Sequence, residues 1–213
     1  MRNGKCAIFI AQELVRIFAI LDAMDRPELH DPRVLRAIAH PVRSRILTEL
    51  DAHGAMRAAD VAAVLGIPAN SASFHLRQLA RFGLIEEDPS AARDRRDRVW
   101  RAADAGDRSI QLDQVEKMPG GKAASKVFRR TKAAWTHHLV DLAYGDDRTP
   151  GVQRTVAEQA LRLTKDEAGE LTNEIVDLVD AWRKRNQGHE DDGRTSYHVL
   201  HIVQPLPDQP GGG

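Results

Sequence analysis

Two short helices on either side of Gly66-Ile67 constrain this sequence more than any other feature. The first is predicted over Asp60–Leu65, where apolar residues recur at helical spacing until Gly66 ends the helix. The second is predicted from Pro68 to Phe82, and Gly83 ends it. Two short helices at this separation are typical of a helix-turn-helix.

The second of these helices has one apolar and one polar side. Ala72, Leu76, Leu79 and Phe82 recur at intervals of three and four residues, so we expect them to face the core. The opposite side carries small polar residues near its start and arginine further on, which suits close entry into a DNA major groove about 12 Å wide. The candidates for contact with bases are Asn70, Ser71, Ser73, Phe74 and Arg77.

Two more helices are predicted before this pair. Asp31-Pro32 supplies an N-cap and a proline at the first helical position, and Pro41 closes this helix. A further helix runs from there to His53-Gly54. The helix predicted at Asp60 has no serine, threonine or asparagine cap, since Arg57 stands at the capping position.

A β-hairpin is predicted after the polar helix. Leu84–Glu87 and Arg98–Arg101 are strand-like runs, and Asp88–Asp97 forms the loop between them. Residues 93–101 carry five arginines and two aspartates, which suits contact with phosphates or a minor groove; a solvated charged loop is the alternative. The candidates for contact with the DNA backbone are Arg43, Gln78, Arg81, Arg93, Arg95, Arg96 and Arg98.

The charge of the chain is distributed unevenly. The formal net charge of zero would argue against a nucleic-acid partner if the charges were evenly spread. Residues 31–103, however, carry twelve basic and nine acidic side chains, whereas residues 104–213 carry fifteen and eighteen. All twelve cations of the first range are arginines, whose planar guanidinium makes forked contacts with phosphate and guanine. The excess is small and supports DNA binding only in combination with the helix pattern.

Three segments carry a family resemblance: LRAIAHPVRSRIL over Leu35–Leu47, SASFHLRQL over Ser71–Leu79 and GLI over Gly83–Ile85. They resemble the arsenic-repressor (ArsR) type of winged-helix regulators across residues 31–102. The resemblance implies a winged helix-turn-helix that binds operator DNA as a homodimer, typically as a repressor released by a ligand. It also places Ser71, Ser73 and Arg77 on the recognition helix.

The same resemblance bears on the effector. Founding members of the family sense metal through a cysteine pair in the third helix, where this chain has Val61–Val64. That sensing chemistry is therefore absent, and a small-molecule effector of unidentified chemistry stays open. Residues 163–167 and 199–205 resemble, more weakly, the C-terminal part of a subgroup of these regulators, which implies no particular ligand.

Residues 104–207 are expected to form a second, helix-rich α+β domain for dimerisation or effector binding, so the whole fold is mainly α with a small β component. Helices are predicted over Lys122–Tyr144 and after the capping box of Thr164 and Glu167. Ser196–Val203 is rich in β-branched and aromatic residues, and we predict a strand there.

Some parts of this half are less defined by the sequence. Thr155–Leu163 is ambiguous between helix and strand, and Ser109–Val115 is a candidate to pair with the predicted strand. Trp135 is expected to anchor the longer helix. The tail over residues 208–213 is expected to be disordered.

Residues 1–30 are predicted to form an amphipathic helix. Polar residues interrupt the apolar stretch Ala7–Met24, so it suits neither a membrane span nor a signal-peptide core. A translation start at Met24 is the alternative to a dimer-packing helix. Cys6 is the only cysteine and allows no disulfide within one chain, as fits a reducing cytoplasm.

Chemistry other than DNA binding finds little support in the sequence. There is no pairing of a nucleophile with a base, no paired acids and no phosphate-binding glycine loop, so we expect neither an enzyme nor a cofactor. The rival to a DNA-binding regulator is a winged-helix module that docks protein, with the acidic second half as its interface.

The histidines are candidates for two roles, as metal ligands and as packing residues. A site built from His137, His138 and Asp141 with His198 and His201 is the less favoured reading, because the last two point to opposite faces of a strand. We therefore predict no metal. His75 lies beside Leu76, which is expected to be buried, and a hydrogen-bonded packing role is favoured over contact with a base. His40 precedes Pro41 and is likewise expected to be structural.

Overall fold

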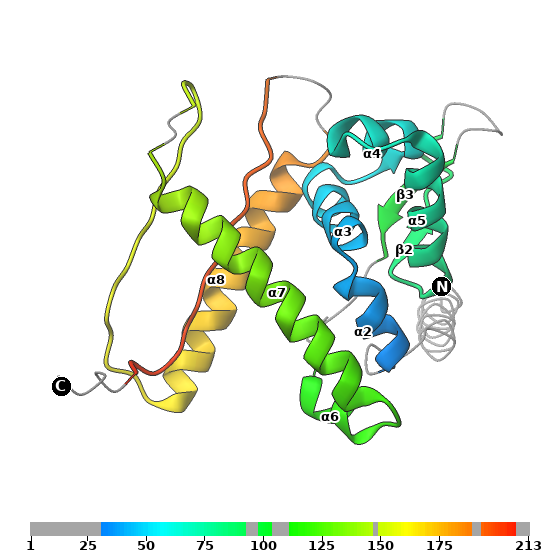
Figure 1. The fold of residues 1–213 in the computed structure, drawn as a ribbon. Helices are drawn as coiled ribbons and strands as arrows, with labels where there is room; N and C mark the ends of the chain where they lie inside the picture. The colour runs from blue at the N-terminus through cyan, green and yellow to red at the C-terminus, as the bar shows by residue number, and fades with distance from the viewer. Residues whose placement is uncertain (1–30, 93–97, 104–110, 147–148, 189–192, 208–213) are drawn as a thin grey trace, which may run out of the picture.

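The computed structural model describes residues 31–92, 98–103, 111–146, 149–188 and 193–207, and it is mostly helical with one small antiparallel sheet (Figure 1). The helix predicted over 1–30 and the tail from 208 lie outside these ranges. The elements are α2 (Pro32–Ala39), α3 (Pro41–His53), β1 (Met56–Arg57), α4 (Ala58–Leu65), α5 (Ala69–Arg81), β2 (Ile85–Glu87), β3 (Val99–Ala102), α6 (Leu112–Lys117), α7 (Gly121–Tyr144) and α8 (Lys165–Asn186).

Local signals set the ends of the first helices. The Asp31 carboxylate accepts a hydrogen bond of 2.7 Å from the backbone N–H of Arg33, which caps α2 as predicted. Gly66 ends α4 with a φ of +64°, and Gly83 follows α5 with a φ of +65°. Both values lie in the left-handed region that only glycine adopts without strain, so the two stops of the helix-turn-helix are fixed by residue type.

The start of α4 corrects the sequence prediction by two residues. The helix begins at Ala58 rather than Asp60. The Asp60 carboxylate reaches back to accept hydrogen bonds from the backbone N–H of Arg57 at 3.0 Å and from its Nε at 2.9 Å. A carboxylate three residues into the helix thus satisfies a free N–H at its start, although Arg57 is not a usual capping residue.

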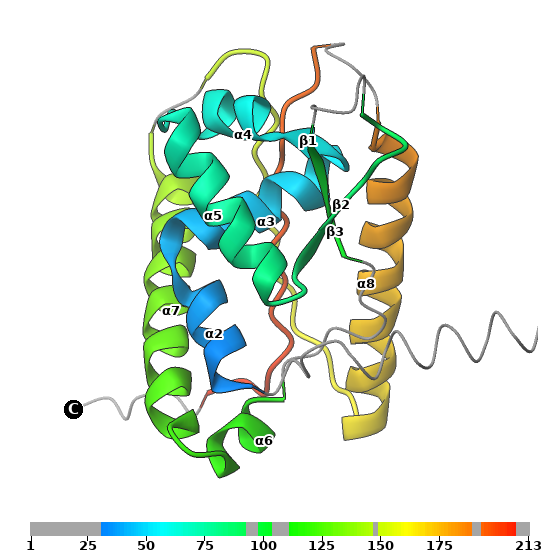
Figure 2. The same cartoon turned by 90° about the vertical axis from the view of Figure 1, so that its right-hand side faces the viewer.

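The sheet has three strands in the order β1-β3-β2, and both pairs are antiparallel (Figure 2). Met56 pairs with Trp100, and Ile85 pairs with Ala102. The two hairpin strands predicted from the sequence are confirmed, with bounds shifted by one residue. The two-residue strand β1 was not expected. Together with α3, α4 and α5, this sheet completes a winged helix-turn-helix fold.

One hydrophobic core holds this unit together. Ala72, Leu76 and Leu79 of α5 are fully buried, as the helical spacing predicted, whereas Phe82 is only partly buried. They belong to one cluster with buried residues of the neighbouring elements. These are Val34, Ala37, Ile46, Leu50, Met56, Val61, Ala62, Leu84, Ile85 and Trp100.

A second, smaller cluster joins α2 to α6 and the first turns of α7. Leu35, Val115 and Ala124 are fully buried against one another. A Cβ on Gly121 would lie 1.7 Å from the carbonyl oxygen of Val115, so only glycine permits this close approach. Because Val115 lies in α6, the prediction of a strand over Ser109–Val115 is wrong for its described part.

The second half departs most from the predicted α+β domain. The long helix and the Thr164–Glu167 capping box are confirmed. The strand predicted over Ser196–Val203 is not formed in the single chain, and Thr155–Leu163 is neither helix nor strand. Trp135 is 37% exposed and so does not anchor α7 as predicted.

We expect Leu76→Ala to lower the free energy of unfolding by about 2–5 kcal/mol, because it leaves a cavity in a fully buried site. Phe74 lies two residues away on the same helix and is half exposed, so Phe74→Ala should cost less than about 1 kcal/mol. Urea unfolding of both variants measures the difference. Equal losses of unfolding free energy in the two variants would contradict the placement of Leu76 on the buried side of α5.

Candidate nucleic-acid interface

The outward side of α5 carries a stripe of exposed side chains. Asn70, Phe74, Arg77 and Arg81 follow one another at intervals of four, three and four residues, and all four are exposed. This spacing places them on the same side of the helix, opposite the buried Ala72, Leu76 and Leu79. We call these four residues the outer stripe.

Three further candidates flank the outer stripe. Ser71, Ser73 and Gln78 are half-buried, so their side chains lie at its margins. The Asn70 Oδ1 accepts a hydrogen bond of 2.8 Å from the backbone N–H of Ser71, in the first turn of the helix. Small groups beside the stripe leave room for a flat or grooved surface to approach the helix backbone.

Phe74 is the most unusual member of the outer stripe. Its side chain is 50% exposed, and its ring meets the edge of His75 at a centroid distance of 5.3 Å. A large apolar ring on a polar surface offers contact with another apolar group, such as the methyl group of thymine.

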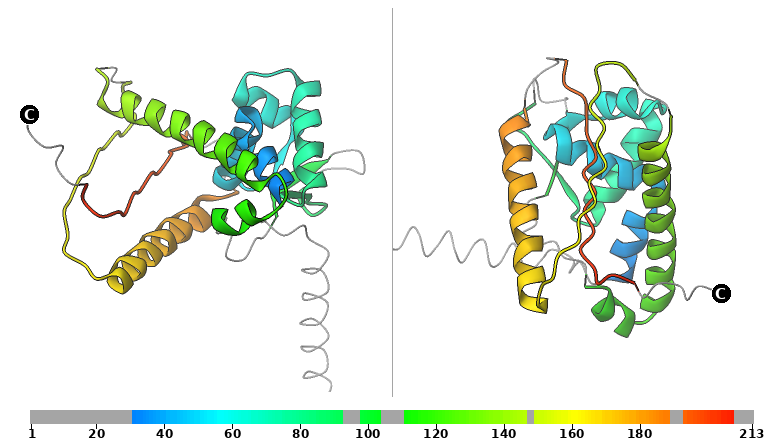
Figure 3. Two further views of the ribbon diagram at one scale, coloured as in Figure 1. Left: turned by 60° about the horizontal axis from the view of Figure 1, so that its bottom comes forward. Right: turned by 90° about the vertical axis from the view of Figure 1, so that its left-hand side faces the viewer.

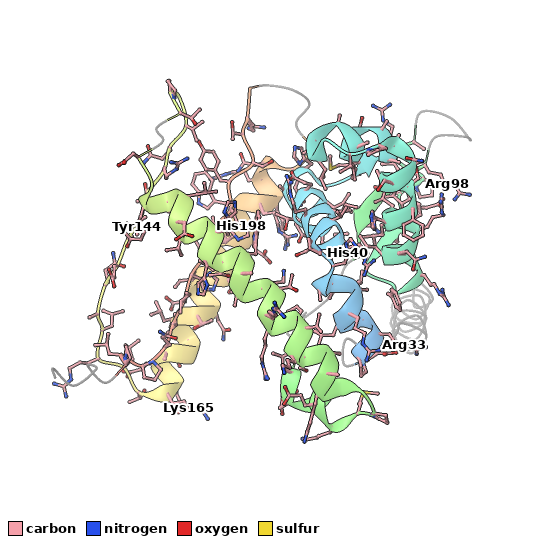
Figure 4. All side chains as sticks on the ribbon, in the orientation of Figure 1. Arg33, His40, Arg98, Tyr144, Lys165 and His198 are labelled. Atoms are coloured by element: carbon pink, nitrogen blue, oxygen red, sulfur yellow. The ribbon has the colours of Figure 1, made fainter. Side chains whose placement is uncertain are left out.

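The strands of the hairpin hold their charges in cross-strand pairs. Arg101 lies 2.5 Å from Glu86, and Arg98 lies 3.6 Å from Glu87. The Arg98 side chain is 65% exposed and reaches outward beyond the sheet (Figure 4). Three predicted backbone contacts of the loop, Arg93, Arg95 and Arg96, lie outside the described residues.

Arg43 has a structural role that the sequence did not indicate. Its Nε donates a hydrogen bond of 2.7 Å to the carbonyl of Ala37, and its Nη2 donates one of 3.2 Å to the carbonyl of Arg36. Partial burial lowers the pKa of the guanidinium from its usual value. The side chain therefore satisfies the last carbonyls of α2, which helix geometry leaves open.

His75 on the buried side of α5 packs against His40, which lies between α2 and α3. The rings of His40 and His75 lie 4.8 Å apart, and the Nδ1 atoms of both are buried without a hydrogen-bond partner among the described residues. Burial lowers the pKa of each imidazole, and the charge of Arg43 adds to this effect. The expected packing role holds for both, but the hydrogen bond expected for His75 is not present at Nδ1. No local sequence pattern indicates that the two rings meet.

The described residues offer no metal site and no membrane-spanning helix. Within the described ranges, no three histidine, cysteine or acidic side chains come together as a metal site. His138 and His198 instead meet the ring of Trp135, at centroid distances of 5.6 and 6.5 Å. No described helix combines the length and apolar character that crossing a membrane requires.

Comparison with known families identifies part of this unit. Residues 38–88 match a family described as a helix-turn-helix domain, which is less than half of the chain. No curated protein matches the chain. The matched range covers all of α3, β1, α4, α5 and β2, so it contains the outer stripe.

Solved structures align over most of the chain, but with low scores. YusO of Bacillus subtilis is 16% identical, covering 85% of this chain and 99% of its own, with a TM-score of 0.32. Apo wild-type MarR of E. coli is 13% identical, covering 78% and 96%, with a TM-score of 0.32. The transcriptional regulator Tm0710 of Thermotoga maritima is 17% identical, covering 82% and 96%, with a TM-score of 0.28. These values support no statement about function.

The family match and the fold agree on a coarse assignment. The helix-turn-helix match lies on the unit formed by α3, α4, α5 and the sheet. This supports a DNA-binding regulator of the winged helix-turn-helix type without distinguishing the arsenic-repressor subtype from other winged-helix families.

The contact between His40 and His75 predicts that the free energy of unfolding decreases as the pH is lowered. Because the folded pKa values lie below the usual 6.5, the unfolded chain binds more protons between those values and pH 6.5. Their contribution is therefore fully present above about pH 6.5 and decreases as the pH falls below it. In urea unfolding between pH 8 and 5, the double variant His40→Gln with His75→Gln should show a shallower decline. An unchanged slope in the double variant would refute the assignment.

Proposed function

We propose that this chain is a homodimeric transcriptional repressor that places α5 in the DNA major groove. The observation that carries the proposal is the outer stripe, held outward by the fully buried side of the same helix. An α-helix fits the major groove of B-DNA, where base edges present donors and acceptors. Two copies related by a two-fold axis would read half-sites about 34 Å apart.

Each candidate has a role that matches its chemistry. Arg77 suits a bidentate contact with guanine, Asn70 suits adenine and Phe74 suits the methyl group of thymine. Ser71 and Ser73 would allow the helix backbone to approach closely.

Contacts with phosphate would fix the register of the helix on the duplex. Gln78 and Arg81 belong to α5. The other candidates are Arg98, beside β3, and the loop residues Arg93, Arg95 and Arg96. Arg43, which already caps α2, would contribute mainly by orienting the start of α3.

The rest of the chain has a place in this proposal. Residues 31–103 form the DNA-binding unit, and residues 104–207 serve dimerisation and, where an effector exists, its binding. We propose the arsenic-repressor type on the strength of the sequence segments quoted above, with a cytoplasmic location and no catalytic role. The effector is then not a metal held by a cysteine pair, since Val61–Val64 occupies that stretch.

A second candidate is a winged-helix module that docks protein. It is favoured by the exposed apolar side chains of the second half, such as Leu178 and Trp182. The two functions differ in their salt dependence. Affinity for DNA should fall linearly in log–log plots against salt, because each neutralised phosphate releases counterions.

Retention of the full chain on heparin or random-sequence DNA should therefore be lost at moderate salt. Changing Arg95 and Arg96 to alanine together should weaken binding to all sequences alike and reduce the salt slope by about two, one for each lost phosphate contact. The exposed Arg130 on α7 gives a matched control, and Arg130→Ala should leave retention unchanged. A chain that fails to bind DNA at low salt would favour the protein-docking module.

Arg77→Ala tests base contact separately from phosphate contact. We expect a loss of about 1–3 kcal/mol on selected sites and a relaxed preference at one base position, because a bidentate contact with guanine is removed. Selection and sequencing of bound DNA with wild-type and variant protein measure both effects. The same uniform weakening as for the Arg95 and Arg96 double variant would contradict the assigned roles.

A further inference from the structure

The described residues of the second half form no core of their own. No residue of α8 is buried, and the buried residues of α7 are confined to its first turns, at Gly121, Ala124 and Ser125. Eighteen large apolar side chains between Val127 and Leu206 are more than a third exposed. One partner of a standard interface contributes about 20–30 residues, so this surface is rich enough in apolar groups to form one.

Two extended segments, 149–163 and 193–207, run along this half. All of their residues are exposed. In the part of the chain that the structure describes, residues 155–163 and 195–207 make no backbone-to-backbone hydrogen bond. Peptide groups are strong donors and acceptors that are normally paired in a folded protein. Residues 155–163 and 195–207 therefore present open strand edges.

The side chains of the second segment point to the same conclusion. Along 197–203, Tyr197, Val199 and Val203 alternate with Leu200 and Ile202, so both faces of an extended chain would be apolar. A strand that is apolar on both faces is typical of one covered on both sides. In the single chain every one of these five side chains is at least 40% exposed.

The two segments also have matching directions. The first connects the end of α7 at Tyr144 to the start of α8 at Lys165, and the second returns from the far end of α8 (Figures 3 and 4). Both run opposite to α8 and so run in the same direction as each other. One contact between them is a hydrogen bond of 3.1 Å from the backbone N–H of Gln153 to the Tyr197 Oη. This is the arrangement of a strand–helix–strand unit, but no backbone hydrogen bond joins residues 155–163 to residues 195–207.

We propose that a second copy of this chain supplies the missing ladder: segments 155–163 and 195–206 of the two protomers pair into one intermolecular β-sheet flanked by α7 and α8. A two-fold axis brings each segment antiparallel to its counterpart, with equal length and equal apolar character. Any other partner would have to bring such a strand of its own. The proposal rests on the homodimer inferred above and specifies its surface.

The exposed apolar surface suits such an interface. The eighteen exposed large apolar side chains counted above all lie on α7, α8 and the two segments. Obligate dimers remove roughly 2,000–5,000 Å² in total. Moreover, α5 lies on the side of the molecule away from the two segments (Figures 1 and 3), so pairing there leaves the outer stripe uncovered.

Hydrogen exchange on the full wild-type chain tests the proposal directly. Backbone N–H groups of 195–203 have no backbone acceptor in the single chain and should exchange as fast as a free peptide. In the paired sheet they should be protected, and protection should disappear on dilution together with the dimer seen by sedimentation. A monomer at all concentrations, or a dimer in which these amides exchange freely, would overturn the proposal. Protection that persists in a monomer would overturn it too, since the chain then covers itself.

A pair of substitutions separates strand pairing from apolar packing. Val199→Pro removes a ladder donor from each of the two copies, so the dimer Kd should rise by about 100-fold or more. Val199→Thr keeps the N–H and the β-branched shape, and its Kd should change by less than about tenfold. Thermal unfolding of the winged-helix unit checks that both variants fold. Equal Kd changes for the two would overturn strand pairing.

The same preparations distinguish this inference from the function proposed above. A strand-paired dimer that fails to bind DNA at low salt would contradict the proposed DNA-binding function and support the proposed interface. A monomer that still binds heparin and DNA through Arg77 would contradict the proposed interface and support the DNA-binding function.

Discussion

The burial of one side of α5 is the constraint on which the DNA-binding unit depends. Ala72, Leu76 and Leu79 are fully buried, and each leucine contributes about 1.5–3 kcal/mol by leaving water. Turning the helix by a single residue would move Phe74 or Arg77 toward the core and expose a leucine. The same contacts that fold the protein therefore fix the direction of the outer stripe, and no separate device is needed to present it.

Elements with local signals could be predicted from the sequence, and elements that depend on distant contacts could not. The N-cap at Asp31 and the left-handed glycines at Gly66 and Gly83 act within one turn of chain, so the helix ends follow from residue type. By contrast, β1 has two residues and exists only because Met56 meets Trp100 across the sheet. The capping of α2 by Arg43 spans six residues and likewise leaves no sequence pattern.

The candidate site divides in the same way. The outer stripe follows from helical spacing alone, and Arg77 is exposed as that spacing required. The packing of His40 on His75 joins residues 35 positions apart, so no local pattern could reveal it. In the second half, the capping box of Thr164 was predictable, whereas the strand over Ser196–Val203 was not formed. Its richness in β-branched and aromatic residues is a property of the segment, but a ladder requires a second strand, which the sequence of one segment does not specify.

The connection between the two halves determines what an interface in the second half can do. Leu35, Val115 and Ala124 lock the start of α7 against α2, and the Lys132 Nζ donates a hydrogen bond of 2.8 Å to the Ser44 Oγ on α3. Partial burial lowers the pKa of Lys132, so this contact lies away from bulk water. Because α7 is continuous from these contacts to Tyr144, it connects the surface proposed for the second copy to α2 and α3. In the proposed dimer, packing at the opposite end of the molecule would thus set the position of α5 relative to its counterpart, and with it the spacing of the two outer stripes.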